Sequence, residues 1–252
     1  GGVPVIWRLL PFEHGQAAMN MAIDEAISEG VARKISPPTI RFYGWTPSAV
    51  SIGCFQNILQ EVDVEECRRQ AVDVVRRRTG GGTVFHDQEG EVTYSVIAPE
   101  MMMGMDILAS YRTVCGWVID ALSDLGITAE FAPINDITVN GKKVSGCAQT
   151  RRGGAFLQHG TVLHSLDARR MFSLLRVDRE KLAQKGLGSA EQRVTSVLEL
   201  CDCTRNELLA SLRGAFLRGK EHTTAELSVG ERDRALELVR SRYGDRGWTF
   251  SR

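Results

Sequence analysis

The chain has 252 residues, of which 43% are hydrophobic and 25% are charged, enough to build one large core or a core with a small appendage. The 31 lysines and arginines balance the 31 aspartates and glutamates, so no global field favours nucleic acid or an anionic membrane as a partner. No apolar run reaches about 18 residues and the N-terminus has no signal-peptide pattern, which predicts a cytoplasmic protein. The 6 cysteines show neither metal-ligand nor disulfide-framework spacing, and we expect free thiols.

The first part of the chain alternates between predicted helices and strands. Apolar residues at helical spacing across residues 19–27 predict an amphipathic helix with one face packed inward. Residues 43–52 indicate a strand pair broken by Pro47, and residues 62–70 indicate a short helix. Residues 72–75 are typical of a buried strand, which leads directly into a glycine-rich loop.

That loop joins the arginines of residues 76–78 to three glycines at residues 80–82, and then to an apolar, strand-like run. Consecutive glycines expose backbone N–H groups without a Cβ in the way, and arginine adds charge and planar donors. The loop is therefore suited to wrap around phosphate or carboxylate oxygens. On this stretch alone, a surface hairpin turn with solvated arginines remains the alternative.

A second group of polar residues lies on a predicted three-stranded antiparallel unit at residues 134–163. Asn140-Gly141 is a strong signal for a two-residue hairpin turn, and Gly153-Gly154 marks a second turn. The strands between these turns carry three candidates for a site: Asp136, Lys143 and His159. Taken by itself, a lysine beside an Asn-Gly turn is more often a solvated charge.

Three further helices are expected. Residues 111–122 have an amphipathic pattern, and Gly126 is suited to end that helix. The patterns that start at Thr204 and Ser228 each place a glutamate three residues later, before an apolar run. Such capping boxes predict two helices near the C-terminus.

In this order, the segments resemble the lipoate–protein ligase and octanoyltransferase family, a branch of the biotin/lipoate ligase fold. The resemblance covers nearly the whole chain and rests chiefly on residues 20–26, 76–87, 143–146 and 159–161. It implies an α+β fold with a large mixed or antiparallel sheet flanked by helices. It also implies one catalytic domain over residues 1–252, with room for a small C-terminal lobe from about Met171 and without the accessory C-terminal domain of many ligases.

The preferred hypothesis is a lipoate–protein ligase, which activates lipoate or octanoate with ATP to an acyl-AMP. The acyl group then passes to a lysine of a lipoyl-domain acceptor, either a 2-oxoacid dehydrogenase E2 or a glycine cleavage H-like protein. Both steps build negative charge, so the catalyst needs fixed donors and cations. The resemblance assigns catalysis to Lys143 and Asp136, with Asp136 either a ligand for Mg²⁺ or the group that orients the incoming lysine.

The resemblance also implies a set of residues that bind the acyl substrate and the nucleotide. They are Arg77, Gly80, Gly81, Gly82, Thr83, Val84, Phe85, His86, Asn135, Ser145, Gly146, Cys147, His159, Gly160 and Thr161. For His86 and His159, a purely structural hydrogen-bonding role remains the alternative. The acyl chain is expected to occupy an apolar tunnel, because its affinity comes from buried area.

An octanoyltransferase is the second hypothesis, because such enzymes in this family use a cysteine nucleophile to take the acyl group from acyl carrier protein. The candidates are Cys147 and Cys54. On a regular strand Lys143 and Cys147 share a face but lie about 13 Å apart, at about 3.3 Å per residue. Only a bulge near Gly146 would shorten this gap. We therefore expect Cys147 to line the acyl tunnel and Cys54 to fill space near the ligand.

Further segments favour the ligase. Residues 132–137 match the ligase form of this loop, whereas one group of transferases has its nucleophile just upstream of the corresponding strand, where this chain has no cysteine. Residues 181–200 also resemble the ligase pattern. Without the accessory domain, the chain is expected to be a compact ligase or the large subunit of a ligase with a separate accessory subunit. A non-catalytic subunit that binds acyl groups and carriers is the third hypothesis.

Overall fold

In the computed structural model, which describes residues 4–176 and 193–252, strands and helices alternate along the chain. The strands are β1 (Trp7–Leu9), β2 (Glu13–Gly15), β3 (Thr39–Trp45), β4 (Ala49–Ile52), β5 (Asp73–Arg76), β6 (Val84–His86), β7 (Glu91–Pro99), β8 (Glu130–Ala132), β9 (Asp136–Val139), β10 (Lys142–Arg152), β11 (Ala155–Leu163) and β12 (His222–Thr224). The helices are α1 (Ala17–Ala32), α2 (Ile58–Glu61), α3 (Val64–Arg69), α4 (Glu100–Met103), α5 (Ile107–Asp124), α6 (Ala168–Leu174), α8 (Val197–Leu200), α9 (Arg205–Leu217), α10 (Val229–Leu238), the π-helical turn η2 (Val239–Tyr243) and α11 (Arg246–Thr249).

The strands form a large sheet and a small one. The large sheet has 9 strands in the order β12-β1-β3-β7-β11-β10-β9-β8, with β2 paired to β3. Its neighbours from β3 to β8 are antiparallel, whereas β12, β1 and β3 run parallel to one another. The small sheet has the order β5-β4-β6. The expected α+β fold with a large mixed sheet is confirmed.

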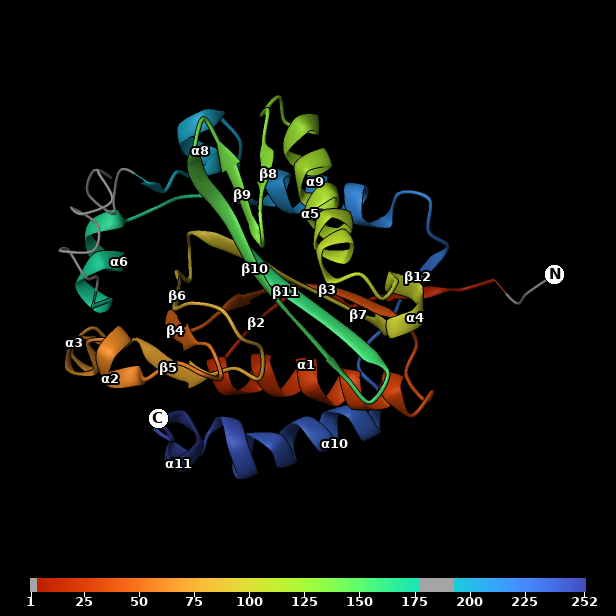
Figure 1. The fold of residues 1–252 in the computed structure, drawn as a ribbon, viewed down its shortest axis with the longest axis horizontal. Coiled ribbons are helices and arrows are strands. Elements are labelled where there is room, and N and C mark those ends of the chain that lie inside the picture. The colour runs from red at the N-terminus through yellow and green to blue at the C-terminus, as the bar shows by residue number, and fades with distance from the viewer. Residues whose placement is uncertain (1–3, 177–192) are drawn as a thin grey trace.

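Helices cover both faces of the large sheet (Figure 1). Helices α5 and α9 pack together on one face, and α1 and α10 pack together on the other. The first face holds the largest apolar core, where the ring of Phe216 from α9 meets the rings of Phe42 and Tyr94 edge-on at 5.1 Å. The apolar spacing at residues 19–27 places the buried side of α1 against the sheet, as predicted.

The hairpin that carries the candidate residues follows the sequence prediction. Asn140 and Gly141 both have positive φ angles, 50° and 76°, which the turn between β9 and β10 requires. Gly153 and Gly154, with φ angles of 59° and 86°, turn the chain from β10 into β11. The predicted capping boxes are also present, with Thr204 starting α9 and Ser228 starting α10.

One element differs from the expectation. The two strands within residues 43–52 are present but do not pair with each other. Strand β3 pairs with β1, β2 and β7 in the large sheet, whereas β4 pairs with β5 and β6 in the small sheet. The chain therefore passes from one sheet to the other at Pro47.

The last part of the chain returns to the main body. Strand β12 extends the large sheet beside β1, and η2 contacts α1.

The expected small lobe from about Met171 stays a prediction, and residues 181–186 and Ser189 lie outside the described residues. No helix within the described ranges has both the length and the apolar character needed to cross a bilayer.

Candidate active site

A cavity of about 260 Å³ lies between the two sheets. The large sheet contributes β3, β7, β10 and β11 to its walls, the small sheet contributes β4 and β6, and α6 lies beside it. Its apolar lining includes Val84, Phe85, Leu163, Met171 and Phe172. A cavity of this kind suits a ligand with an alkyl chain and a single polar end.

Most of the predicted site residues line this cavity. Those that do are Arg77, Gly82, Thr83, Val84, Phe85, His86, Asn135, Lys143, Ser145, Gly146, Cys147, His159, Gly160 and Thr161. Gly80, Gly81, Asp136 and Cys54 are not among the lining residues. The residues that the sequence did not single out for a site include Met21, Tyr43, Trp45, Ser51, Thr93, Ala148, Leu163, Met171, Phe172, Leu175 and Val194. Most of them come from seven different elements, so no local pattern connects them.

Lys143 is held in place by its own hairpin. Its Nζ lies 2.9 Å from Oδ1 of Asp136, and the two side chains are 45% and 38% exposed. Asp136 pairs in register with Gly146, and a Cβ at Gly146 would lie 2.7 Å from both Cε and Nζ of Lys143. The lysine therefore lies along the strand over a glycine, with its cation at the open edge of the cavity.

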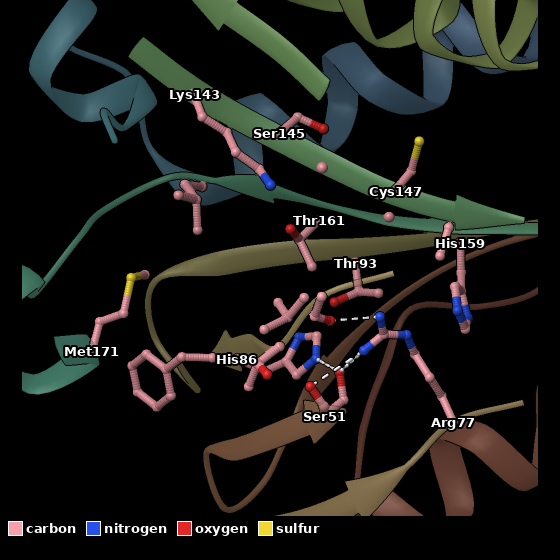
Figure 2. A pocket seen from close by; sticks show the side chains of 18 of the residues that line it. Ser51, Arg77, His86, Thr93, Lys143, Ser145, Cys147, His159, Thr161 and Met171 are labelled. Atoms are coloured by element: carbon pink, nitrogen blue, oxygen red, sulfur yellow. Dashed lines mark hydrogen bonds between the residues drawn. The ribbon is translucent and has the colours of Figure 1, made fainter. Parts of the chain in front are cut away.

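A register shift between Lys143 and Ser145 changes the expected relation between Lys143 and Cys147. The prediction that the two side chains share a face is wrong, because the bulge reverses the alternation. Figure 2 shows the Lys143 side chain and the Cys147 sulfur leaving β10 in different directions. Cys147 borders the cavity, but its Sγ packs in the apolar core between the large sheet and α5, 3.7 Å from Sγ of Cys115.

The surroundings of the Cys147 thiol disfavour its thiolate. The hydrogen bond with Cys115, together with burial, raises the pKa of Cys147 well above its usual value. Its Sγ also donates to the carbonyl oxygen of Asn135 at 3.3 Å. Reactive cysteines have lowered pKa values in electropositive, partly exposed surroundings, so this thiol lacks the usual activation.

The Arg77 guanidinium donates its hydrogen bonds to oxygen atoms of the protein itself. Its Nε donates to Oγ1 of Thr79, its Nη1 donates to the carbonyl and hydroxyl oxygens of Ser51, and its Nη2 donates to the carbonyl oxygens of Gly80 and Gly82. These bonds account for all of its N–H donors. Burial lowers the pKa of Arg77 to about 10. The expected contact with phosphate or carboxylate oxygens would require one of these bonds to break.

The glycine loop packs closely against the end of β4. A Cβ at Gly53 would lie only 2.3 Å from the carbonyl oxygen of Gly81. Gly81 itself has a φ of 88°, which other residues rarely adopt. Because two carbonyl groups of the loop face Arg77, the guanidinium and the neighbouring strand together determine the loop's path.

A family model described as the lipoyl protein ligase A/B catalytic domain matches residues 16–217. The chain belongs to this family. The resemblance expected from the motifs is thereby confirmed, and the fold is that of the family's solved members.

Relatives of this lipoyl ligase A/B domain include both anticipated classes of enzyme. The octanoyltransferase LipM of Brevibacillus brevis is 33% identical over 275 residues, which span 98% of this chain and 99% of LipM. A bipartite lipoate protein ligase of Thermoplasma acidophilum, described with its E2 lipoyl domain, is 31% identical with a TM-score of 0.85 over 98% of this chain and 96% of the ligase. A lipoate-protein ligase A bound with ATP is 28% identical with a TM-score of 0.83, covering 98% of each chain. The chain is therefore an enzyme of the lipoate ligase and octanoyltransferase family.

The lipoyl ligase A/B domain was also expected to hold Mg²⁺ through Asp136. Among the described residues, no cluster of three or more His, Cys, Asp or Glu side chains is arranged to hold a metal ion. Asp136 offers one carboxylate, which is paired with Lys143. Mg²⁺ is usually bound by one or two carboxylates together with substrate phosphates. Asp136 thus supplies one of the carboxylates that such an ion would take, and its role as a ligand stays a prediction.

Proposed function

We propose that the chain is an octanoyltransferase, which moves an octanoyl group from the thioester of a carrier protein to the ε-amine of a lysine on a lipoyl domain. The observation that carries this proposal is an apolar cavity with the cation of Lys143 at its open edge. The cavity suits an alkyl chain, and the lysine suits its carbonyl end. The octanoyltransferase relatives, which match along almost the entire chain, support a thioester as the acyl donor.

For this reaction, the protein must stabilise the negative charge that develops on the acyl oxygen. A thioester is already activated, so attack by a neutral amine forms the C–N bond, the C–S bond breaks, and the amine proton leaves with the thiol. Negative charge develops on the acyl oxygen during the attack. Lys143 stabilises that charge, and Asp136, at 2.9 Å from its Nζ, orients the ammonium group toward the carbonyl.

The proposed transfer goes directly from the thioester to the acceptor lysine and does not pass through Cys147. The thiol packs against Cys115 with a raised pKa, on the face of the strand away from Lys143. Cys54, the other candidate, is not among the residues that line the cavity. Neither thiol combines access to the cavity with an activating environment.

Replacement of Cys147 with serine tests the direct route. We expect the initial rate of octanoyl transfer to stay within about threefold of the wild type, because a packing thiol contributes little to the barrier. The rate is measured from intact masses of the lipoyl domain, with Cys201→Ser as a control. A loss of more than about a hundredfold, together with an octanoyl thioester trapped on wild-type Cys147, would instead establish a cysteine nucleophile.

An ATP-dependent lipoate–protein ligase is the second candidate, and the packed state of the Cys147 thiol favours it. A free carboxylic acid needs activation by ATP, and ligase chemistry needs no cysteine. The likeness to the ATP-bound ligase and to the bipartite ligase supports this candidate. In this case Mg²⁺ would enter with ATP, and a separate accessory subunit would be a partner. In both cases the acceptor is a lipoyl domain, such as that of an E2 or H-like protein.

The proposed transferase activity is tested with octanoyl-acyl carrier protein, a lipoyl domain and apyrase, which removes any ATP. We expect the lipoyl domain to gain one octanoyl group, whereas a lipoyl domain whose acceptor lysine is replaced by arginine gains none. Transfer that appears only after apyrase is omitted would reject the transferase.

A further inference from the structure

Two buried carboxylates are connected to Arg77 through matching chains of hydrogen bonds. In the first chain, Oδ2 of Asp24 lies 2.9 Å from Nδ1 of His159, and Nε2 of His159 lies 2.6 Å from Oγ1 of Thr79. The same Thr79 oxygen accepts a hydrogen bond from Nε of Arg77 at 3.1 Å. Asp24 is also paired with Arg41 at 2.9 Å.

The second chain reaches the other side of the same guanidinium. Oε1 of Glu91 lies 2.7 Å from Nδ1 of His86, and Nε2 of His86 lies 2.8 Å from Oγ of Ser51. That Ser51 oxygen accepts a hydrogen bond from Nη1 of Arg77 at 3.2 Å. Both chains therefore have the order carboxylate, imidazole, hydroxyl, guanidinium, although their members come from distant parts of the sequence.

The direction of each bond follows from donor chemistry. A carboxylate accepts, so Nδ1 of His86 and of His159 must carry the proton. A neutral imidazole then presents Nε2 as an acceptor, so the hydroxyl groups of Ser51 and Thr79 donate to it. Their oxygens are left to accept from Arg77, as the distances require. Burial lowers the pKa of His159, which keeps this imidazole neutral.

In the part of the chain that the structure describes, Arg77 is buried without a carboxylate beside it, and these chains of hydrogen bonds supply indirect connections to two carboxylates. Arg77 is 5% exposed, and no carboxylate of the described residues lies within 4.0 Å of its guanidinium. Glu91 is fully buried, and within the described part of the chain its Oε2 has no hydrogen-bond partner. A buried charge is costly unless it is compensated. The second chain of hydrogen bonds connects Arg77 to the Glu91 carboxyl group through His86 and Ser51.

We propose that Asp24–His159–Thr79 and Glu91–His86–Ser51 are two positioning relays that hold the Arg77 guanidinium against the carbonyl groups of Gly80 and Gly82. The relays thereby fix the glycine loop beside the acyl cavity. His86, His159, Ser51 and Thr79 act through Arg77 and not on the reacting atoms. The functional part of this inference rests on the proposed acyl transfer, whereas the geometric part does not.

The geometric part is tested by NMR of ¹⁵N-labelled histidine in the wild-type protein without substrate. The chain has 5 histidines, so each signal can be assigned with single His→Gln variants. We expect the Nδ1–H tautomer for His86 and His159. His164 is an internal control, because its Nε2 lies 2.7 Å from the carbonyl oxygen of Cys203 and must carry the proton. The Nε2–H tautomer at His86 or His159 would overturn the relay that contains it.

The functional part is tested by Thr79→Val, which keeps the side-chain shape but removes the hydroxyl group. We expect the KM for the octanoyl donor to rise about tenfold while kcat changes less than about threefold, because the loop shifts but Lys143 does not. Thr79→Ser, which restores the hydroxyl group, should recover most of the loss. Equal kcat and KM values for the valine variant and the wild type would reject a positioning role.

The two tests separate the possible failures. The tautomers are measured without turnover, so they remain informative if the chain transfers no octanoyl group. In that event, binding of octanoate to Thr79→Val and Thr79→Ser is compared by calorimetry, with the same order of affinities expected. Equal affinities would overturn the role of the relay at the cavity.

Discussion

We expect the replacement of Lys143 with alanine to lower the rate of acyl transfer by about a thousandfold, at the upper end of the effect of removing one oxyanion donor. The lysine is the cation at the open edge of the cavity, 2.9 Å from Asp136 and packed over Gly146. The expected loss lies in kcat, because the charge that Lys143 stabilises develops only during the attack. The rate is measured from intact masses of the lipoyl domain under single-turnover conditions.

Stability separates this effect from unfolding. The Lys143 side chain is 45% exposed, and exposed ion pairs contribute little to the free energy of unfolding, so the variant should remain folded. Lys142→Ala is the matched control, since the adjacent lysine is exposed and does not line the cavity. A folded Lys143→Ala variant with wild-type kcat would remove Lys143 from the mechanism.

Replacing Gly53 with alanine is the second substitution with a large expected effect. The new Cβ would lie 2.3 Å from the carbonyl oxygen of Gly81 and 3.1 Å from the carbonyl carbon of Gly80. Both are backbone atoms, so the loop must move and strain its bonds with Arg77. We expect a loss of about 1–3 kcal/mol in the free energy of unfolding, the usual cost of overpacking, and a weaker affinity for the acyl donor.

Gly80→Ala is the matched control within the same loop. Its Cβ would meet only the ring of Phe55, at 3.9 Å, which is an ordinary contact. Urea unfolding and the KM for the octanoyl donor are measured for both variants. If Gly53→Ala were as stable and as active as Gly80→Ala, the close contact between β4 and the glycine loop would not constrain the site.

The parts of the fold that sequence reasoning predicted have local signals. The turn at Asn140-Gly141 depends on two residues that tolerate positive φ, and the capping boxes at Thr204 and Ser228 depend on side chains three residues apart. The predicted helix at residues 111–122 lies within α5 for the same reason, because its apolar spacing is contained in one segment. The pairing of β3 with β7 instead of β4 depends on distant partners, so no local pattern indicates it.

For the site, too, residues within local motifs were predicted from the sequence, whereas contacts between distant residues were not. Lys143 and the glycine loop stand out as motifs, and Lys143 and Gly82 line the cavity. The bulge after Lys143 has no simple sequence signal and reverses the side on which Cys147 lies. Ser51 and Glu91 lie 40 residues apart and meet only through His86. The binding role of Arg77 stays a prediction, and the sequence does not reveal that its donors bond to oxygens of Ser51, Thr79 and the glycine loop.

The central claim is that this chain transfers an octanoyl group from a thioester, and intact-mass spectrometry of the acceptor tests it most directly. A lipoyl domain is incubated with the protein and octanoyl-acyl carrier protein without ATP, and in parallel with free lipoate and Mg²⁺-ATP. The account predicts an octanoyl mass gain in the first reaction. A gain only in the second reaction would identify a lipoate–protein ligase and contradict the claim. No gain in either reaction would also contradict it, and would indicate a ligase that needs an accessory subunit or a non-catalytic acyl-binding subunit.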